Sequence, residues 1–283
     1  MSTYHTSVLV EEVIEGLNIE PGKKYIDATY GGGGHAKKIR EKGGIVLGID
    51  TDSDAISRVE QTTNLTVVKG NFRDIREIAQ TNEFEQVSGI LMDLGVSSYQ
   101  FDTPEKGFSY RFLESPLDMR LDQTQGMTVA EYIKGAPEEE LYEIFTKFGE
   151  EERARAIVHA LIRTRQIKKI TTVGQLVKSI DMAVGDIPDK FGVYSRVFQA
   201  LRIYINDELG ALRDALGSMY ELLVPNGRLA IISFHSLEDR IVKQFMRSGN
   251  WKQVSKKPIV ADVREITINK RSRSAKLRIV EKI

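Results

Sequence analysis

Three aspartates in this chain could bind a ligand through their carboxylates. Asp27, Asp50 and Asp93 each end a short apolar run that has the length of a buried β-strand. In a doubly wound parallel sheet, the carboxyl ends of the strands meet at one edge, and ligands bind there. Carboxylates accept hydrogen bonds from hydroxyl and N–H groups and attract cations. The sequence therefore predicts one polar ligand site built from several strand ends.

A glycine-rich turn, Gly31 to Gly34, precedes a predicted helix over residues 35–41. Glycine tolerates positive φ and lacks a Cβ, so a ligand can lie against the backbone. The helix also offers unpaired N–H groups at its N-terminus. Residues 31–36 fit the dinucleotide fingerprint, and residues 27–33 read Asp-x-Thr-x-Gly-x-Gly, which resembles the first motif of S-adenosylmethionine-dependent methyltransferases. The alternative is a glycine-rich turn that binds nothing.

Two further positions indicate a ligand with a nucleoside part. Asp50 comes 17 residues after Gly33, where Rossmann-like folds carry the acid that binds ribose hydroxyls. Its alternative role is to cap a helix over residues 53–60, and one residue can serve both roles. Phe72 follows a third apolar strand over residues 65–69, where methyltransferases place a side chain against adenine. The alternative is an aromatic side chain of the core.

The spacing of the apolar strands predicts an interrupted sheet. After Asp93, the next comparable strand is 228–234. A parallel crossover needs only a dozen or more residues, so most of the intervening chain is an insertion. Its sequence has helical periodicity, with helix starts at Thr128 and Thr172.

The predicted fold is therefore α/β. A Rossmann-like sheet is assigned to residues 1–121 and 197–283, with an inserted all-α domain at 122–196. Other expected elements are a helix over residues 8–17, one apolar helix face over 198–212, a turn at 225–227, a helix over 238–246, and closing strands at 251–254 and 275–280.

The composition excludes several classes of protein. Of 283 residues, 41% are hydrophobic and 28% are charged, which is ordinary for a globular protein. No apolar run approaches the roughly 20 residues that span a bilayer, and the N-terminus does not resemble a signal peptide. The chain has no cysteine and only four scattered histidines, so we expect no disulfide and no metal site. We expect a cytoplasmic protein, and the sequence leaves open whether it is a monomer or a homodimer.

The net charge of zero hides an asymmetry. Residues 252–283 contain ten Lys or Arg against three acids, so this end carries +7 and the rest of the chain −7. A basic end on an acidic body suits a polyanion such as RNA, although most charge runs are simply solvated surface. The candidates for phosphate contacts are Lys270, Arg271, Arg273, Arg163, Arg165, Lys168 and Lys169.

Short segments along the whole chain are specific to one family when they are taken in order. These segments are His5-x-x-Val8-Leu9, residues 27–35, 48–50, 93–98, 105–109, 116–120, 148–151, 198–203, 206–209, 234–240 and 273–278. Together they resemble the ribosomal RNA small-subunit methyltransferase H family, also called the MraW family.

This resemblance implies a class I methyltransferase fold and S-adenosylmethionine as the cofactor. It also implies that the chain methylates the 4-amino group of a decoding-site cytidine in the 16S RNA of the small ribosomal subunit. The cofactor-binding residues that it implies are Gly33, Gly34, His35, Asp50, Phe72, Asp93 and Gln100. His35 would otherwise be interpreted as an ordinary helix-start residue.

Methyl transfer from a sulfonium requires the acceptor to be aligned with the methyl group. A cytosine amine is a weak nucleophile, and a group that accepts its N–H hydrogen bond would help. Asp93, Ser97 and Ser98 lie on the loop where related amine methyltransferases place such groups. Ser233 and His235 could contact the base or a phosphate, and their equally weighted alternative is to cap the helix at 238–246. A base inside folded RNA must be splayed or flipped out first.

Two other functions compete with methyl transfer. An NAD-linked oxidoreductase could use the same fold, but the position of Asp27 and the lack of an evident substrate acid–base pair argue against it. A non-catalytic RNA-binding factor in ribosome assembly could have kept the fold, and the intact loops at the four strand ends argue against that.

Overall fold

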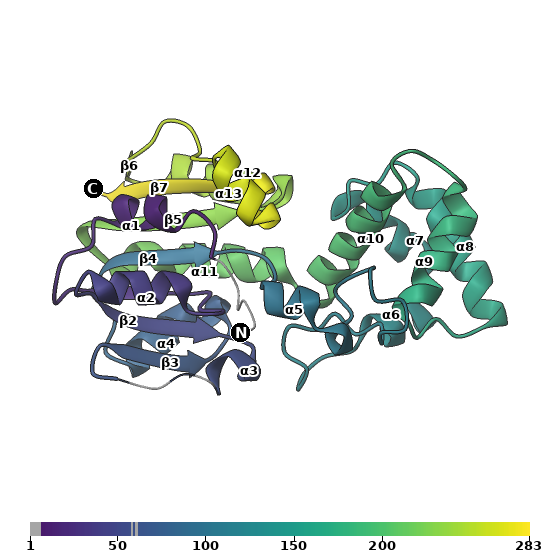
Figure 1. Ribbon diagram of the computed structural model, residues 1–283, viewed down its shortest axis with the longest axis horizontal. Coiled ribbons are helices and arrows are strands. Elements are labelled where there is room, and N and C mark those ends of the chain that lie inside the picture. The colour runs from purple at the N-terminus through teal and green to yellow at the C-terminus, as the bar shows by residue number, and fades with distance from the viewer. Residues whose placement is uncertain (1–6, 58, 60–61) are drawn as a thin grey trace. The chain divides into compact units, whose positions relative to one another are not determined.

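The computed structural model describes residues 7–57, 59 and 62–283, and its chain forms two compact units (Figure 1). The first unit comprises Met1–Ser97 and Leu209–Ile283, and the second comprises Ser98–Glu208. His5 of the family segments lies outside the described residues. No helix in the described chain is long and apolar enough to cross a membrane.

The first unit is built on a seven-stranded sheet with the order β3-β2-β1-β4-β5-β7-β6. Its strands are β1 (Lys24–Asp27), β2 (Ile45–Asp50), β3 (Leu65–Lys69), β4 (Val87–Asp93), β5 (Leu223–Ser233), β6 (Trp251–Gln253) and β7 (Lys276–Lys282). The first five strands run parallel, and β7 is antiparallel to both β5 and β6. The predicted α/β fold of the class I methyltransferase type is confirmed.

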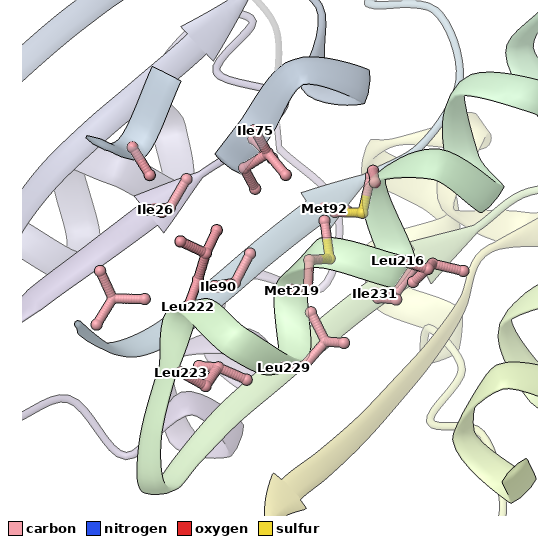
Figure 2. Packing of buried hydrophobic residues seen from close by; sticks show 14 of the residues in the cluster. Ile26, Ile75, Ile90, Met92, Leu216, Met219, Leu222, Leu223, Leu229 and Ile231 are labelled. Atoms are coloured by element: carbon pink, nitrogen blue, oxygen red, sulfur yellow. The ribbon is translucent and has the colours of Figure 1, made fainter. Parts of the chain in front are cut away.

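Both faces of this sheet are buried because alternate side chains along each strand enter different cores. Tyr25 and Leu91 lie in a cluster with α1 and α2, whereas Ile26 and Ile90 lie in a cluster with α4, α11 and α12. Figure 2 shows the second cluster. The helices of this unit are α1 (Val10–Leu17), α2 (Gly34–Glu41), α3 (Ser53–Ile56), η1 (Phe72–Asp74), α4 (Ile75–Thr81), α11 (Glu208–Leu222), α12 (Ser236–Ser248), α13 (Val263–Ile268) and η3 (Lys270–Ser274).

The second unit is helical in its described secondary structure. Its elements are α5 (Ser98–Asp102), η2 (Pro104–Lys106), α6 (Val129–Gly135), α7 (Glu138–Lys147), α8 (Ala154–Ile167), α9 (Val173–Val184) and α10 (Lys190–Ile205). The helix starts predicted at Thr128 and Thr172 are confirmed, since each hydroxyl caps its helix in a capping box.

Residues ahead of the predicted insert also pack within the second unit. The N–H of Leu117 donates to the carbonyl of Thr171 at 3.0 Å, and the Asn206 side chain bonds both Leu121 N–H and the carbonyl of Met119 at 2.8 Å. These contacts agree with a second unit that starts before residue 122. That residues 122–196 form a domain of their own stays a prediction.

The structure corrects three expected elements. The single helix face at 198–212 is divided between α10 and α11, because Asp207 adopts a left-handed φ of 45° that breaks the helix. The expected turn at 225–227 lies inside β5, where Asn226 has a φ of 63° beside a register shift against β4. The described helix after Asp50 covers only Ser53–Ile56, and residue 60 lies outside the description.

We predict that Gly107→Ala destabilises the protein far more than Gly126→Ala does. Both glycines have positive φ, 69° and 68°, so both variants pay the left-handed strain of roughly 1–2 kcal/mol. An added Cβ at Gly126 meets no atom within 4 Å, whereas at Gly107 it would clash with the carbonyl oxygen of Pro116. Overpacking should cost Gly107→Ala a further ~1–3 kcal/mol in urea unfolding. Equal losses in the two variants would contradict this packing.

Candidate active site

The three aspartates lie at the carboxyl ends of neighbouring strands, as predicted. Asp27 ends β1, which pairs with β2 on one side and with β4 on the other, and Asp50 and Asp93 end those two strands. Three carboxylates therefore converge on one edge of the sheet, although they come from distant parts of the sequence.

Asp50 shapes the glycine-rich turn directly. Its Oδ2 accepts a hydrogen bond from the N–H of Gly31 at 2.6 Å, and its Oδ1 accepts one from Asp52 N–H at 2.8 Å. Each carboxylate oxygen has a second lone pair and can accept a hydroxyl donor as well. The predicted capping role and the predicted ribose contact are thus compatible, and the ribose contact stays a prediction.

The glycines of the turn serve different physical purposes. Gly31 has a φ of 52°, and a Cβ there would meet only the carbonyl oxygen of Thr29, 3.8 Å away. A Cβ at Gly33 would collide with the ring of Tyr30, and one at Gly34 with the hydroxyl of Ser7. Packing within the protein therefore requires glycine at 33 and 34, and open space for a ligand is found at Gly31. Cofactor contacts of Gly33 and Gly34 remain predictions.

His35 anchors the segment that precedes α1. Its ring is buried, and its Nε2 lies 2.9 Å from the carbonyl oxygen of Val8. A carbonyl can only accept, so Nε2 carries the proton in this contact. This structural contact leaves the cofactor assignment of His35 a prediction.

Asp27 and Asp93 both have a buried carboxylate oxygen that lacks a hydrogen-bond partner among the described residues, Oδ2 in Asp27 and Oδ1 in Asp93. Thr29 links the two strand ends: its N–H donates to Asp27 Oδ1 at 3.3 Å, and its hydroxyl accepts from Asp93 N–H at 2.6 Å. Buried acceptors without donors indicate that a bound group supplies them.

Burial also changes the acidity of both carboxyls. The pKa of Asp27 is raised to about 6, chiefly because burial penalises the charged form; Asp93 and Asp50 raise it further, and His35 opposes the rise. Burial likewise raises the pKa of Asp93, against the influence of His35 and Arg271. A cationic ligand would favour the ionised forms of both groups. The site therefore fits the ammonium and sulfonium groups of S-adenosylmethionine.

For the other predicted cofactor and catalytic residues, the structure gives burial and position but no contact that tests their roles. Phe72 is partly buried in η1 and packs against the hydrophobic core, so its core interpretation is confirmed, while an adenine contact stays a prediction. Ser97 ends the first unit, and the side chain of Ser98 lies outside the description. Gln100 is buried in α5 of the second unit, and its cofactor role stays a prediction. No group of residues suited to a metal occurs in the described chain.

At the end of β5, His235 caps α12. Its Nδ1 accepts from Glu238 N–H at 3.4 Å, while Glu238 Oε2 accepts from Phe234 N–H at 2.8 Å. Nε2 lies 3.1 Å from Glu238 Oε1, and it has no hydrogen-bond partner among the described residues. The capping alternative is confirmed for His235. Ser233 is buried beside the carbonyl of Lys276, 3.5 Å away. A catalytic role for His235 stays a prediction.

Two contacts from the C-terminal segment were missed by the sequence analysis. Arg271 was a candidate phosphate contact, but its guanidinium donates to the carbonyl of Val96 and lies 5.7 Å from the ring centroid of Phe234. Glu265 Oε1 accepts from Leu9 N–H at 2.7 Å. Both join positions more than 170 residues apart, which no local pattern indicates. In the second unit, Arg165 is bound by the carbonyls of Ile133 and Ala136.

Comparison with known proteins identifies the family of the chain. The model of the MraW methylase family matches residues 2–283. A relative from Deinococcus deserti is 46% identical over 100% of this chain and 94% of its own length; one from Bacteroides thetaiotaomicron is 41% identical over 99% and 98%. A third, from Deinococcus radiodurans, is 44% identical over 98% and 89%. All three bear the name ribosomal RNA small subunit methyltransferase H. The chain therefore belongs to the MraW methylase family, and it is a methyltransferase that uses S-adenosylmethionine.

Proposed function

We propose that the chain methylates the exocyclic 4-amino group of a decoding-site cytidine in the 16S RNA of the small ribosomal subunit. The names of its relatives support small-subunit ribosomal RNA as the substrate. In the structure, the observation that carries the proposal is the buried Oδ1 of Asp93, which lacks a partner among the described residues at the end of β4. Membership in a methylase family contradicts the NAD-linked alternative.

S-adenosylmethionine supplies a methyl group on a positively charged sulfur. Asp27 offers its unpartnered Oδ2 to the cationic end of this cofactor, and Asp50 offers carboxylate lone pairs to the ribose. Phe72 is assigned to the adenine. Gly33, Gly34, His35 and Gln100 complete the proposed binding set.

Asp93 acts on the amine in this proposal. Its carboxylate accepts a hydrogen bond from the amino group, which fixes the direction of the nitrogen lone pair and takes up the proton lost when the new C–N bond forms. Because Thr29 holds the backbone of Asp93 at 2.6 Å, this acceptor has a defined position. Ser97 and Ser98 are the proposed additional contacts, and His235 is a further candidate through Nε2.

The RNA is proposed to reach the site with its target base flipped out. Lys270, Arg273, Arg163, Lys168 and Lys169 remain candidates for phosphate contacts. Arg271 and Arg165 are less suited, because their guanidinium groups already bind backbone carbonyls. A substrate in the ribosomal subunit implies work in the cytoplasm. A homodimer remains one of two oligomeric states consistent with the proposal.

We predict that incubation of unmethylated small subunits with labelled cofactor places one methyl group on the 4-amino nitrogen of one cytidine. Enzymes that methylate carbon-5 of cytosine attack the ring through a cysteine, and this chain has none. RNA with 5-fluorocytidine at the target should therefore turn over without trapping the protein. Mass spectrometry of the digested RNA locates the methyl group.

The variant Asp93→Asn tests the role of the carboxylate. It should reduce turnover by about 10²–10³-fold, the range for loss of one preorganised electrostatic contact. A stable protein–RNA adduct, or 5-methylcytidine in the digest, would overturn the mechanism. Binding of subunits without any methyl incorporation would instead support a non-catalytic assembly factor.

The raised pKa of Asp27 gives a pH dependence to cofactor binding. Below about pH 6 the carboxyl of the free protein is protonated, and a cationic ligand must first ionise it. Affinity for S-adenosylmethionine should therefore fall by up to about tenfold per pH unit below pH 6, and level off above it. Calorimetry between pH 5 and 7 measures this, since the ligand's α-amino group stays protonated there. The Asp27→Asn variant should bind S-adenosylmethionine weakly, and its affinity should change less with pH. If affinity changed with pH equally in the variant and the unmodified protein, Asp27 would be excluded as the titrating group.

Asp50→Ala should weaken cofactor binding by about 1–3 kcal/mol, because the ribose loses an acceptor and Gly31 N–H loses its partner. Asp74→Ala is the control, since Asp74 is exposed and its side chain makes no capping hydrogen bond to α4. Calorimetry with S-adenosylmethionine at pH 7 compares the two variants. Equal affinities for the Asp50 variant and the unmodified protein would refute the assignment.

A further inference from the structure

The first unit carries a basic surface that the proposed active site does not use. Helix α12 buries Leu237, Val242 and Met246 against the sheet and exposes Lys243 and Arg247 on its other side. A hollow runs between this helix and the chain after β6. Its lining residues are Lys243, Met246, Arg247, Gln253, Ser255, Lys256, Arg278, Ile279 and Val280. We call this hollow the basic groove.

A second hollow continues along the same helix. It is lined by Arg240, Lys243, Gln244, Arg247 and Ser248. Lys243 and Arg247 therefore border both hollows. The surface is polar and cationic, and its apolar residues Met246, Ile279 and Val280 are buried.

The two acids nearest the groove are already paired with other cations. Asp239 is held by Arg278 through contacts of 2.7 and 3.1 Å, and Glu281 is held by Arg228 and Lys252. Among the described residues, Lys243, Arg247 and Lys256 form no ion pair. Arg247 also stands in the last turn of α12, where a cation stabilises the helix dipole. That explanation does not extend to Lys243 in the middle of the helix or to Lys256 outside it.

Helix α12, which borders the groove, starts close to the carboxyl edge of the sheet, where Asp27, Asp50 and Asp93 lie. β5 ends at Ser233, one register position past the pair Asp93–Ile232, and α12 begins at Ser236. With a rise of 1.5 Å per residue, Lys243 and Arg247 lie about 10 and 16 Å along the helix from that start. A nucleic acid strand leaving the edge could follow this row of cations.

We propose that the basic groove binds phosphates of the ribosomal RNA strand that flanks the target nucleotide. This inference rests on the proposed function. An excess of unpaired cations without an exposed apolar centre fits a phosphate backbone better than a protein surface, whose interfaces have apolar cores. The groove thus contributes affinity and register, while Asp93 and its neighbours determine the chemistry.

The test compares Lys243→Gln/Arg247→Gln with Lys37→Gln/Lys42→Gln. The control pair is exposed on and just after α2, over the opposite face of the sheet, and it changes the net charge equally. For protein-free 16S RNA, the groove variant should lower the slope of log affinity against log salt by about 1.4–1.8, the value for two lost phosphate contacts. With small subunits, KM should rise at least tenfold, with kcat and S-adenosylmethionine affinity unchanged.

Slopes and KM values equal to those of the control pair would overturn the proposal. A loss of affinity for intact subunits but not for protein-free RNA would also overturn it, because the groove would then contact a ribosomal protein. RNA binding is measured without turnover. The salt slopes therefore test the groove even if the proposed methyl transfer does not occur. Circular dichroism and cofactor affinity confirm that both variants are folded.

Discussion

The proposed active site depends on one constraint: carboxylates are buried beside one another at the carboxyl edge of the sheet. Asp27 and Asp93 end adjacent strands, and burial raises the pKa of each because their charged forms lose water. The protein offsets this in part: the N–H of Thr29 donates to the carboxylate of Asp27, and His35 favours the ionised carboxyls. The Thr29 hydroxyl accepts from the backbone N–H of Asp93 and so links the two strand ends. One oxygen of each carboxylate still lacks a hydrogen-bond partner among the described residues. Stability is thus given up at the place where binding is required.

Segments near both ends of the chain form hydrogen bonds close to the same edge. Leu9, at the start of α1, donates its N–H to Glu265 of α13, and the neighbouring Val8 accepts from His35. Arg271 of η3 fastens the loop after Asp93 through the carbonyl of Val96. The segment between β6 and β7 therefore supports both the glycine turn and the loop of the proposed acceptor carboxylate. Its basic composition suggested RNA contact, but part of its charge serves this internal purpose.

The sequence was sufficient for features with a local period or a fixed spacing. Short continuous apolar runs predicted the strands, and the carboxyl-edge rule placed Asp27, Asp50 and Asp93 together. The sequence could not show that Tyr30 and Ser7 fill the space beside Gly33 and Gly34, because that depends on how the side chains pack in the folded chain. The break at Asp207 was missed for a related reason. The apolar period continues through it, while one left-handed residue redirects the chain.

Asn206 has a consequence for how the sheet assembles. β4 must pair with β5 across about 140 residues of sequence, and closing so long a loop is entropically costly and slow. Within the second unit, the Asn206 side chain hydrogen-bonds the backbone of Met119 and Leu121. A second unit that folds first therefore brings the two sides of the loop together near these residues. The free length falls to about 50 residues, which removes roughly 1 kcal/mol of closure entropy. If the second unit folds first, it therefore shortens the loop that the central strands must close.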